Sequence, residues 1–289
     1  MPAARLVADR VPANAAPAGW EARLRLGFER TSSRTVLASR RHVGPLRVQK
    51  PLYPEGAEVC QVVVVHPPGG IVAGDSLTIE VDAGLRAHAQ LTTPGAAKWY
   101  RSAGPVARSD TVLRVATGAL VEWLPQETML FDGARTAIRL TVELAGDARF
   151  IGWDVTHLGR TASGERFASG RLQQRFELFR DGSMLWCERA VLDGGTHALQ
   201  SSAILNGAPV FGTLIAAGGF LVDDGVLAAC RAVVCASGDG AVTRLPDVFV
   251  ARYRGDSAHA ARTYFATLWR VLRPALAGRE AVPPRIWNT

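Results

Sequence analysis

Alternation of apolar and polar residues with a period of two constrains this chain more than any other feature. The segments 77–82 (LTIEVD) and 138–144 (IRLTVEL) place apolar side chains on one face and polar side chains on the other. This pattern is typical of half-buried β-strands. Asp-Gly turn signals begin at positions 132, 181, 193 and 224, and the one at 181 separates two strand-like runs, as in a hairpin. The sequence therefore predicts a mainly β protein built from many short strands.

A single segment near the C-terminus has helical periodicity instead. Ser257 is a suitable N-cap, apolar residues follow at positions 261, 265, 268 and 272, and Pro274 is expected to end the pattern. We predict an amphipathic helix over Ser257–Arg273. Its apolar stripe packs either on the protein's own core, which is the interpretation we favour, or against a partner protein. Because strands and helices do not alternate along the chain, a Rossmann or TIM-barrel architecture is not expected.

The chain is basic, but the distribution of its charges does not favour nucleic-acid binding. Lys and Arg together number 33 against 26 Asp and Glu, a formal net charge of +7. Apart from Lys50 and Lys98 these basic residues are arginines, scattered between acidic residues, and no zinc-finger or RNP-like motif accompanies them. We therefore expect no nucleic-acid partner.

Cysteine content and the N-terminal segment bear on location. Four cysteines in 289 residues do not make a disulfide framework, so we expect free thiols in a reducing cytoplasm. Residues 1–19 are rich in Ala and Pro and lack the continuous apolar stretch of a signal peptide. We expect a flexible tail there, followed by a single domain over residues 20–289.

An uncharged stretch between Asp193 and Asp223 has the length of a membrane span. Asn206, Pro209 and several glycines interrupt it, however, and such residues are typical of turns. We therefore expect buried short strands and turns here, and no membrane association. An apolar surface covered by a partner is a third interpretation.

Residues 66–75 (HPPGGIVAGD) form a loop rich in Pro and Gly. The loop lacks the Lys and hydroxyl residues of a phosphate-binding loop, and the chain carries no serine-hydrolase, zinc-protease or kinase signature. His66 opens the loop and Asp75 closes it, and both are ligand types for a divalent ion such as Ni²⁺. On spacing alone we favour the simpler interpretation, in which both side chains cap the adjacent strand and turn.

Several other carboxylates stand in apolar surroundings. Glu122 and Glu127 flank WLPQ, Asp154 follows Gly-Trp, and Glu188 follows Leu-Trp-Cys. Burying an unpaired carboxylate is costly, so each must be paired, hydrated or bound to a cation. Pairing with an arginine, such as Glu188 with Arg189, is one interpretation. A water-filled passage lined by acids is another, and paired carboxylates of a glycosidase-like hydrolase are the enzyme alternative.

Longer strings in a fixed order identify a family resemblance. They are GPLRVQKPLYPE (44–55), HPPGGIVAGD (66–75), LTTPGAAKWYRS (91–102), EWLPQE (122–127) and PPRIW (283–287). This order resembles the UreD family of urease accessory proteins, also called UreH, over roughly residues 20 to 287. Thr161 and Lys50 depart from the family pattern, and residues 193 to 245 match it poorly.

The resemblance implies a scaffold or chaperone in urease maturation and nickel insertion rather than an enzyme. Expected partners are apo-urease, UreF and, through UreF, the GTPase UreG. Ni²⁺ would pass transiently through an internal water-filled passage, with no tightly bound cofactor. The implied fold is a stacked, flattened β-helix-like or sandwich architecture with a C-terminal helical element. The positions that match the family's passage-lining acids are Asp75, Asp154 and Glu188. Additional passage or loop residues are expected at His66, Ser102, Glu127 and His157.

Overall fold

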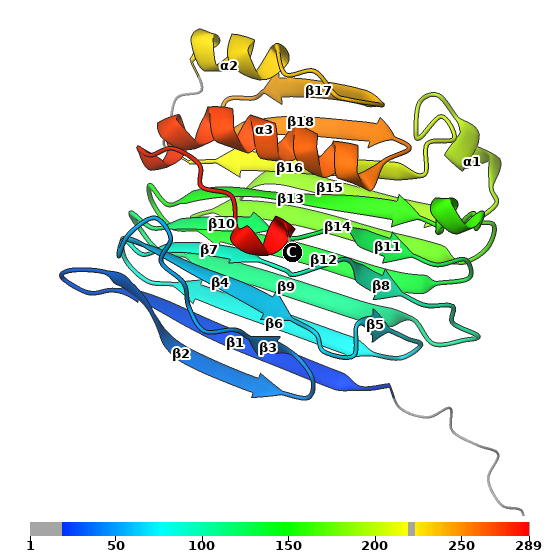
Figure 1. Cartoon of the computed structure of the whole chain (residues 1–289), viewed down its shortest axis with the longest axis horizontal. Helices are drawn as coiled ribbons and strands as arrows, with labels where there is room; N and C mark the ends of the chain where they lie inside the picture. The colour runs from blue at the N-terminus through cyan, green and yellow to red at the C-terminus, as the bar shows by residue number, and fades with distance from the viewer. Residues whose placement is uncertain (1–18, 219–222, 289) are drawn as a thin grey trace, which may run out of the picture.

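A computed structural model describes residues 19–218 and 223–288, which form two stacked β-sheets with a helix on one outer face (Figure 1). The flexible tail expected over residues 1–19 lies, apart from Gly19, outside the described residues. Short strands dominate the chain, as the period-two alternation predicts. The prediction of a mainly β, stacked architecture is confirmed.

The smaller sheet has seven strands and the larger has eleven. The smaller sheet has the order β15 (Ser183–Asp193), β14 (Arg171–Arg180), β12 (Arg135–Leu144), β9 (Ala107–Val115), β6 (Ser76–Ala83), β1 (Glu21–Arg30), β2 (Thr35–Val43). The larger sheet has the order β17 (Asp239–Arg244), β18 (Val248–Gly255), β16 (Val210–Ala217), β13 (Arg149–Leu158), β10 (Leu120–Leu124), β7 (His88–Thr92), β4 (Val59–Val65), β3 (Arg47–Val48). Three short strands branch from β13 in the same sheet: β11 (Thr128–Leu130) pairs with β13, β8 (Ala97–Trp99) pairs with β11, and β5 (Gly70–Ile71) pairs with β8.

The chain alternates between the two sheets, so that each coil adds one strand to each. Strands β1, β6, β9, β12 and β14 are parallel in the smaller sheet, and β4, β7, β10 and β13 are parallel in the larger. Antiparallel hairpins close the stack at its edges. In the β14–β15 hairpin, Asp181 and Gly182 both have positive φ, as a tight primed turn requires. The predicted hairpin at this position is confirmed.

The main core fills the space between the sheets. Alternate side chains of each strand point inward and are removed from water, which is the largest favourable contribution to folding. The smaller sheet contributes Leu26, Val81, Leu113, Val142 and Leu178, and the larger sheet contributes Val62, Leu91, Val121, Phe150 and Ile215.

Helix α3 (Ala258–Ala277) covers the outer face of the larger sheet and forms a second core with it (Figure 1). Ser257 caps the helix by accepting a hydrogen bond from the backbone N–H of Ala260, at 3.2 Å. The predicted apolar stripe, at positions 261, 265, 268 and 272, is buried in this second core. The helix is therefore confirmed, and its stripe packs on the protein's own sheet.

The predicted end of the helix at Pro274 is wrong. The helix continues to Ala277, and Gly278 ends it in the left-handed conformation with φ 66°. A proline inside a helix lacks the N–H that would bond the carbonyl four residues earlier. The side chains of Arg273 and Leu276 are fully buried on either side of it, and their contacts hold the last turn in place.

The remaining helices are short: α1 (His197–Gln200), α2 (Asp224–Arg231) and the 3₁₀ turns η1 (Thr161–Ser163) and η2 (Arg285–Asn288). The uncharged stretch after Asp193 contains the buried strand β16, as expected, and also the short helix α1, which was not expected. Residues 219–222 lie outside the described part. Among the helices that the structure describes, none has both the length and the apolar character to cross a membrane. All four cysteines are free thiols, as predicted.

Candidate functional site

Three neighbouring parallel strands of the larger sheet are interrupted at the same level. Residues 66–69 separate β4 from β5, residues 93–96 separate β7 from β8, and residues 125–127 separate β10 from β11. Each interruption contains proline, at positions 67, 68, 94 and 125, and proline cannot donate to a strand ladder. Among the parallel strands β4, β7, β10 and β13, only β13 runs past this level without a break.

A cavity of about 400 Å³ lies between the sheets at these interruptions. The larger sheet lines it with the interruption segments and with Lys98, Trp123 and Asp154. The smaller sheet lines it with apolar side chains and with Ser109, Thr111, Arg139, Gln174 and Arg175. Of the predicted site residues, Asp154 and His66 line this cavity. Asp154 is the single acidic side chain among the described lining residues.

Asp154 projects from β13 into the gap and has an amide, not a cation, as its hydrogen-bond partner. Its Oδ2 accepts a hydrogen bond from Nε2 of Gln174 on β14, at 2.7 Å. Burial and the nearby charge of Glu188 raise the pKa of Asp154 to about 7, against the opposing effects of Gln174 and Arg252. No salt bridge reaches Asp154 within residues 19–218 and 223–288. It is thus a half-buried carboxyl whose pKa lies well above the ordinary range of aspartate.

Glu188 reaches across from the edge strand β15 to the larger sheet. Its Oε1 accepts hydrogen bonds from Nη1 of Arg252, at 2.6 Å, and from Oγ1 of Thr213, at 3.2 Å. Thr213 stands opposite both Asp154 and Arg252 in the strand register. Glu188 therefore lies beside Asp154 and has its charge compensated by Arg252. The interpretation in which an arginine pairs with Glu188 is confirmed, but the partner is Arg252 and not Arg189, because neighbours on a strand point to opposite faces.

Asp75 has a different environment from the other two predicted acids. Its Oδ1 accepts a hydrogen bond from the backbone N–H of Trp20, at 2.8 Å, and its Oδ2 accepts one from that of Val72, at 2.9 Å. Both oxygens thereby fix the end of the 66–75 loop, which agrees with the capping interpretation. Asp75 is absent from the described lining of the cavity. His66 does line it, and burial lowers the pKa of its imidazole while the charge of Asp75 opposes this effect.

The three other expected residues lie outside the described cavity lining. Ser102 donates from Oγ to the carbonyl of Pro105, at 2.6 Å, within its own turn. Glu127 forms an ion pair with Arg262 of α3, at 3.0 Å. His157 lies with Nε2 at 3.1 Å from Oγ1 of Thr161, and burial lowers its pKa.

The chemistry available in the cavity is that of a weak cation site. A carboxyl, an amide and an imidazole face a space large enough for water, and the cationic side chains of Lys98, Arg139 and Arg175 also line it. The described residues contain no cluster of three or more His, Cys, Asp or Glu that could hold a metal. A glycosidase needs two carboxylates flanking the substrate, whereas Glu188 is held by Arg252. Sequence reasoning missed Gln174, Thr213 and Arg252, which carry no local signal in the chain.

Comparisons with known proteins identify the family. The sequence profile described as UreD urease accessory protein matches residues 21–288. A protein of Nitrosococcus oceani named urease accessory protein UreD is 52% identical over 284 residues, which cover 98% of this chain and 95% of that protein. Proteins of the same name are 53% identical in an Azoarcus species, covering 98% and 99%, and 52% identical in Pseudomonas aeruginosa, covering 93% and 95%.

These matches extend over nearly the whole fold, including both sheets, the interruptions of the larger sheet and α3. The resemblance noted from the short strings is thereby confirmed, and the related proteins carry the name of an accessory protein rather than of an enzyme. The chain belongs to the UreD family of urease accessory proteins.

Proposed function

We propose that this protein assists urease maturation in the cytoplasm by letting Ni²⁺ pass through the cavity between its two sheets. Apo-urease and UreF are the proposed direct partners, and UreG joins through UreF. Ni²⁺ is cargo in this proposal, and no cofactor is bound tightly. The names of the related proteins support the role in urease maturation, and Asp154 in its cavity supports the passage.

The observation that carries the proposal is a carboxyl without an arginine partner in an internal cavity of about 400 Å³. Most buried acids are neutralised by an adjacent cation, because an isolated buried charge is costly. Asp154 has the Gln174 amide instead, and it shares the electrostatic influence of Glu188. A divalent cation would neutralise the negative charge of Asp154 while it is bound. When the cation leaves, the carboxyl returns to its hydrogen bond with Gln174.

The donor set suits transit rather than storage. Conduction requires sites that are favourable enough to enter and weak enough to leave. Oxygen donors and water bind Ni²⁺ less tightly than a closed set of imidazole and thiolate ligands does. In the proposed passage Asp154 is the central contact, and Glu188, held beside it by Arg252, shapes the approach along β15. Asp75 keeps the 66–75 loop, and with it His66, in position.

The test replaces the acids and measures nickel in urease. Asp154→Asn keeps the size of the side chain and removes its charge, and Glu188→Gln and Asp75→Asn do the same at the flanking positions. Each variant is coexpressed with urease and the other accessory proteins, and nickel per urease active site is measured together with capture of urease and UreF. We expect Asp154→Asn to lower nickel content while both partners still bind.

Asp110→Asn is the matched control, because Asp110 lies on β9 and outside the described lining of the inter-sheet cavity. We expect normal nickel content with this variant. Full nickel loading by the triple variant at positions 75, 154 and 188 would refute the passage. Loss of partner binding in every variant would instead indicate that the acids serve the fold.

A further inference from the structure

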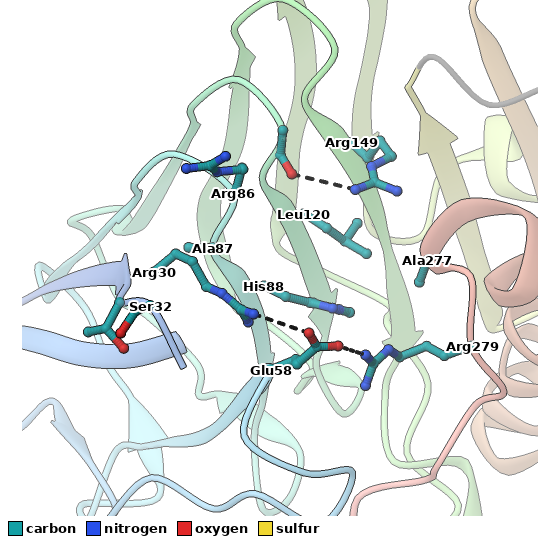
Figure 2. A pocket seen from close by; sticks show the side chains of 12 residues that line it. Arg30, Ser32, Glu58, Arg86, Ala87, His88, Leu120, Arg149, Ala277 and Arg279 are labelled. Atoms are coloured by element: carbon teal, nitrogen blue, oxygen red, sulfur yellow. Dashed lines mark hydrogen bonds and ion pairs between the residues drawn. The ribbon is translucent and has the colours of Figure 1, made fainter. Parts of the chain in front are cut away.

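A second pocket, of about 560 Å³, lies where the parallel strands of the larger sheet begin (Figure 2). His88, Leu120 and Arg149 are the first residues of β7, β10 and β13 and stand opposite one another in register. The turns before these strands, the turn after β1 and the end of α3 form its walls. Among the described residues, it shares no lining residue with the inter-sheet cavity.

Four guanidinium groups surround this pocket against a single carboxylate. Figure 2 shows Arg86 and Arg149 on one side and Arg30 and Arg279 on the other, with His88 between them. Glu58 is the one acid among the described lining residues. Because almost all basic residues of this chain are arginines, the number of arginines alone means little. What each guanidinium contacts is the informative property.

Glu58 holds two of the four arginines. Its Oε1 pairs with Arg30 at 3.1 Å, and its Oε2 pairs with Arg279. The hydrogen bond from Arg30 and the charge of Arg279 lower the pKa of Glu58, so it stays ionised at neutral pH. One carboxylate thus bridges two guanidinium groups and compensates only one of their two charges.

The other two arginines have no carboxylate partner within the described part of the chain. Arg149 donates from Nη1 to the carbonyl of Leu276, at 2.7 Å, and more weakly from Nη2 to the carbonyl of Gly118, at 3.5 Å. These neutral acceptors orient its guanidinium without neutralising it. Arg86 has no side-chain hydrogen bond among the described residues, and its backbone has φ 56°, an uncommon conformation for a residue with a side chain.

The floor of the pocket is rigid. Nε2 of His88 lies 2.6 Å from Oε1 of Glu122, which is fully buried beneath α3 and also contacts Arg273 and Trp269. The imidazole is therefore anchored from below by a network that leads into the second core. A rigid floor and the fixed guanidinium groups of Arg30, Arg149 and Arg279 reduce the entropy lost when a ligand binds.

We propose that this pocket binds a phosphate-class polyanion, either free or carried by a larger molecule. Guanidinium groups form two parallel hydrogen bonds with phosphate oxygens, and four of them converge on one concave site. A phosphate group concentrates about two negative charges and three acceptor oxygens in a small volume. That charge density matches the uncompensated arginines better than a single carboxylate does. This assignment does not depend on the nickel passage.

The test titrates the purified full-length chain with pyrophosphate by isothermal calorimetry in about 0.15 M salt, where weak surface attraction is screened. We expect saturable binding of one pyrophosphate per chain. Arg86→Gln and Arg149→Gln should each weaken it about tenfold, the scale of one charge-assisted hydrogen bond. Arg41→Gln, which removes an exposed arginine of β2, is the matched control and should leave the affinity unchanged.

Three results would overturn the proposal: no binding, equal weakening by Arg41→Gln, or tighter binding of the tricarboxylate citrate than of pyrophosphate. Unfolding temperatures of all variants separate lost binding from lost structure. Arg86→Gln is the decisive variant, because the Arg86 guanidinium makes no hydrogen bond or ion pair within the described residues. A nucleoside diphosphate titrated in parallel distinguishes the sources. If the nucleoside diphosphate and pyrophosphate bind with equal affinity, the pocket recognises the phosphate groups alone. If the nucleoside diphosphate binds more tightly, the ligand of the pocket is a nucleotide.

Discussion

The buried Glu122 and the half-buried Asp154 have pKa values on opposite sides of the ordinary range. Burial raises the pKa of both carboxyls, but for Glu122 the hydrogen bonds and charges of His88 and Arg273 outweigh it and bring the pKa to about 2. Asp154 has only Gln174 and a more distant Arg252, and Glu188 repels its charge, so its pKa is about 7. The difference comes from the partners of each residue, not from its depth.

The high pKa of Asp154 predicts a pH-dependent stability. The folded carboxyl keeps its proton up to about pH 7, whereas the unfolded one releases it near 3.8, so the native state loses stability as pH rises between these values. Asp154→Asn removes this loss. We expect the variant to gain about 2 kcal/mol in free energy of unfolding, relative to the wild type, between pH 5 and pH 8. Urea denaturation at the two pH values checks this, and a difference independent of pH would contradict it.

At the residue scale, the sequence indicates which acids stand in apolar surroundings but not which ones lack a partner. Asp75, Asp154 and Glu188 were all expected to line one passage, yet their contacts differ: backbone N–H groups for Asp75, an amide for Asp154 and Arg252 for Glu188. These partners come from distant strands. No local pattern around Glu188 predicts that Arg252 lies opposite it.

Helix α3 is docked by a buried ion network as well as by its apolar stripe. Arg273 is fully buried, and its guanidinium contacts Glu55 at 2.6 Å and Glu122 at 2.9 Å. Trp269 donates from Nε1 to Glu122, also at 2.6 Å. Such a network contributes little over an apolar core, but removing one member leaves a buried charge unpaired.

Arg273→Met therefore tests the docking of the helix. We expect a loss of about 3–5 kcal/mol in free energy of unfolding, because Glu55 and Glu122 both lose the buried guanidinium that pairs with them. Arg270→Met on the exposed side of the same helix is the control, expected within about 0.5 kcal/mol of the wild type. Chemical denaturation followed by tryptophan fluorescence measures both, and equal effects of the two variants would show that the network adds nothing to the docking.

The N-cap of α3 supports a smaller prediction. Ser257→Ala removes the acceptor for the backbone N–H of Ala260 and should lower the free energy of unfolding by about 1 kcal/mol. Ser257→Asp keeps an acceptor and should preserve stability. Thermal unfolding of the two variants side by side distinguishes the cap from a general effect of substitution at this position.

At the element scale, periodicity predicts the strands and the helix well, since both follow from which face is buried. It fails at Pro274, where the buried side chains of Arg273 and Leu276 override the proline. The interruptions of the larger sheet were visible as prolines at positions 67, 94 and 125. The sequence did not show that these interruptions lie side by side in the sheet, because their position depends on how the coils stack.

The two sheets end in edge strands. Among these, β2 has the longest run of exposed residues. From Ala38 to Val43 this edge strand is exposed, and it carries Arg40, Arg41 and His42. An exposed edge invites pairing with another chain, and charged side chains there oppose it. The basic run of the chain thus has a use at the surface that is unrelated to nucleic acid.

Arg40→Val with Arg41→Val should promote self-association. We expect the unfolding temperature to stay close to that of the wild type, while light scattering at high protein concentration increases, because the edge loses its charge repulsion. The conservative pair Arg40→Lys with Arg41→Lys keeps the charge and should behave as the wild type does. Scattering that is unchanged in the valine variant would refute this role.

For the whole molecule, the coils could not be found as a sequence repeat because their lengths differ. The distance in sequence between register partners on successive strands gives the length of each coil. Thr78 stands opposite Asp110, Asp110 opposite Arg139, and Arg139 opposite Arg175, and these three spacings differ. Local alternation reveals strands of either sheet equally well. Which strands share a sheet is decided by long-range packing.

The buried pair of Glu122 and Arg273 also has a consequence for how the protein is made. The two residues are 151 positions apart in the chain. At about 5–20 residues per second, a ribosome needs on the order of ten to thirty seconds to reach the arginine after it has produced the glutamate. During that interval α3 does not yet cover the outer face of the larger sheet, and Glu122 lies there among apolar side chains without Arg273. Until α3 has been made, this apolar face and its acid are open to contacts with other molecules.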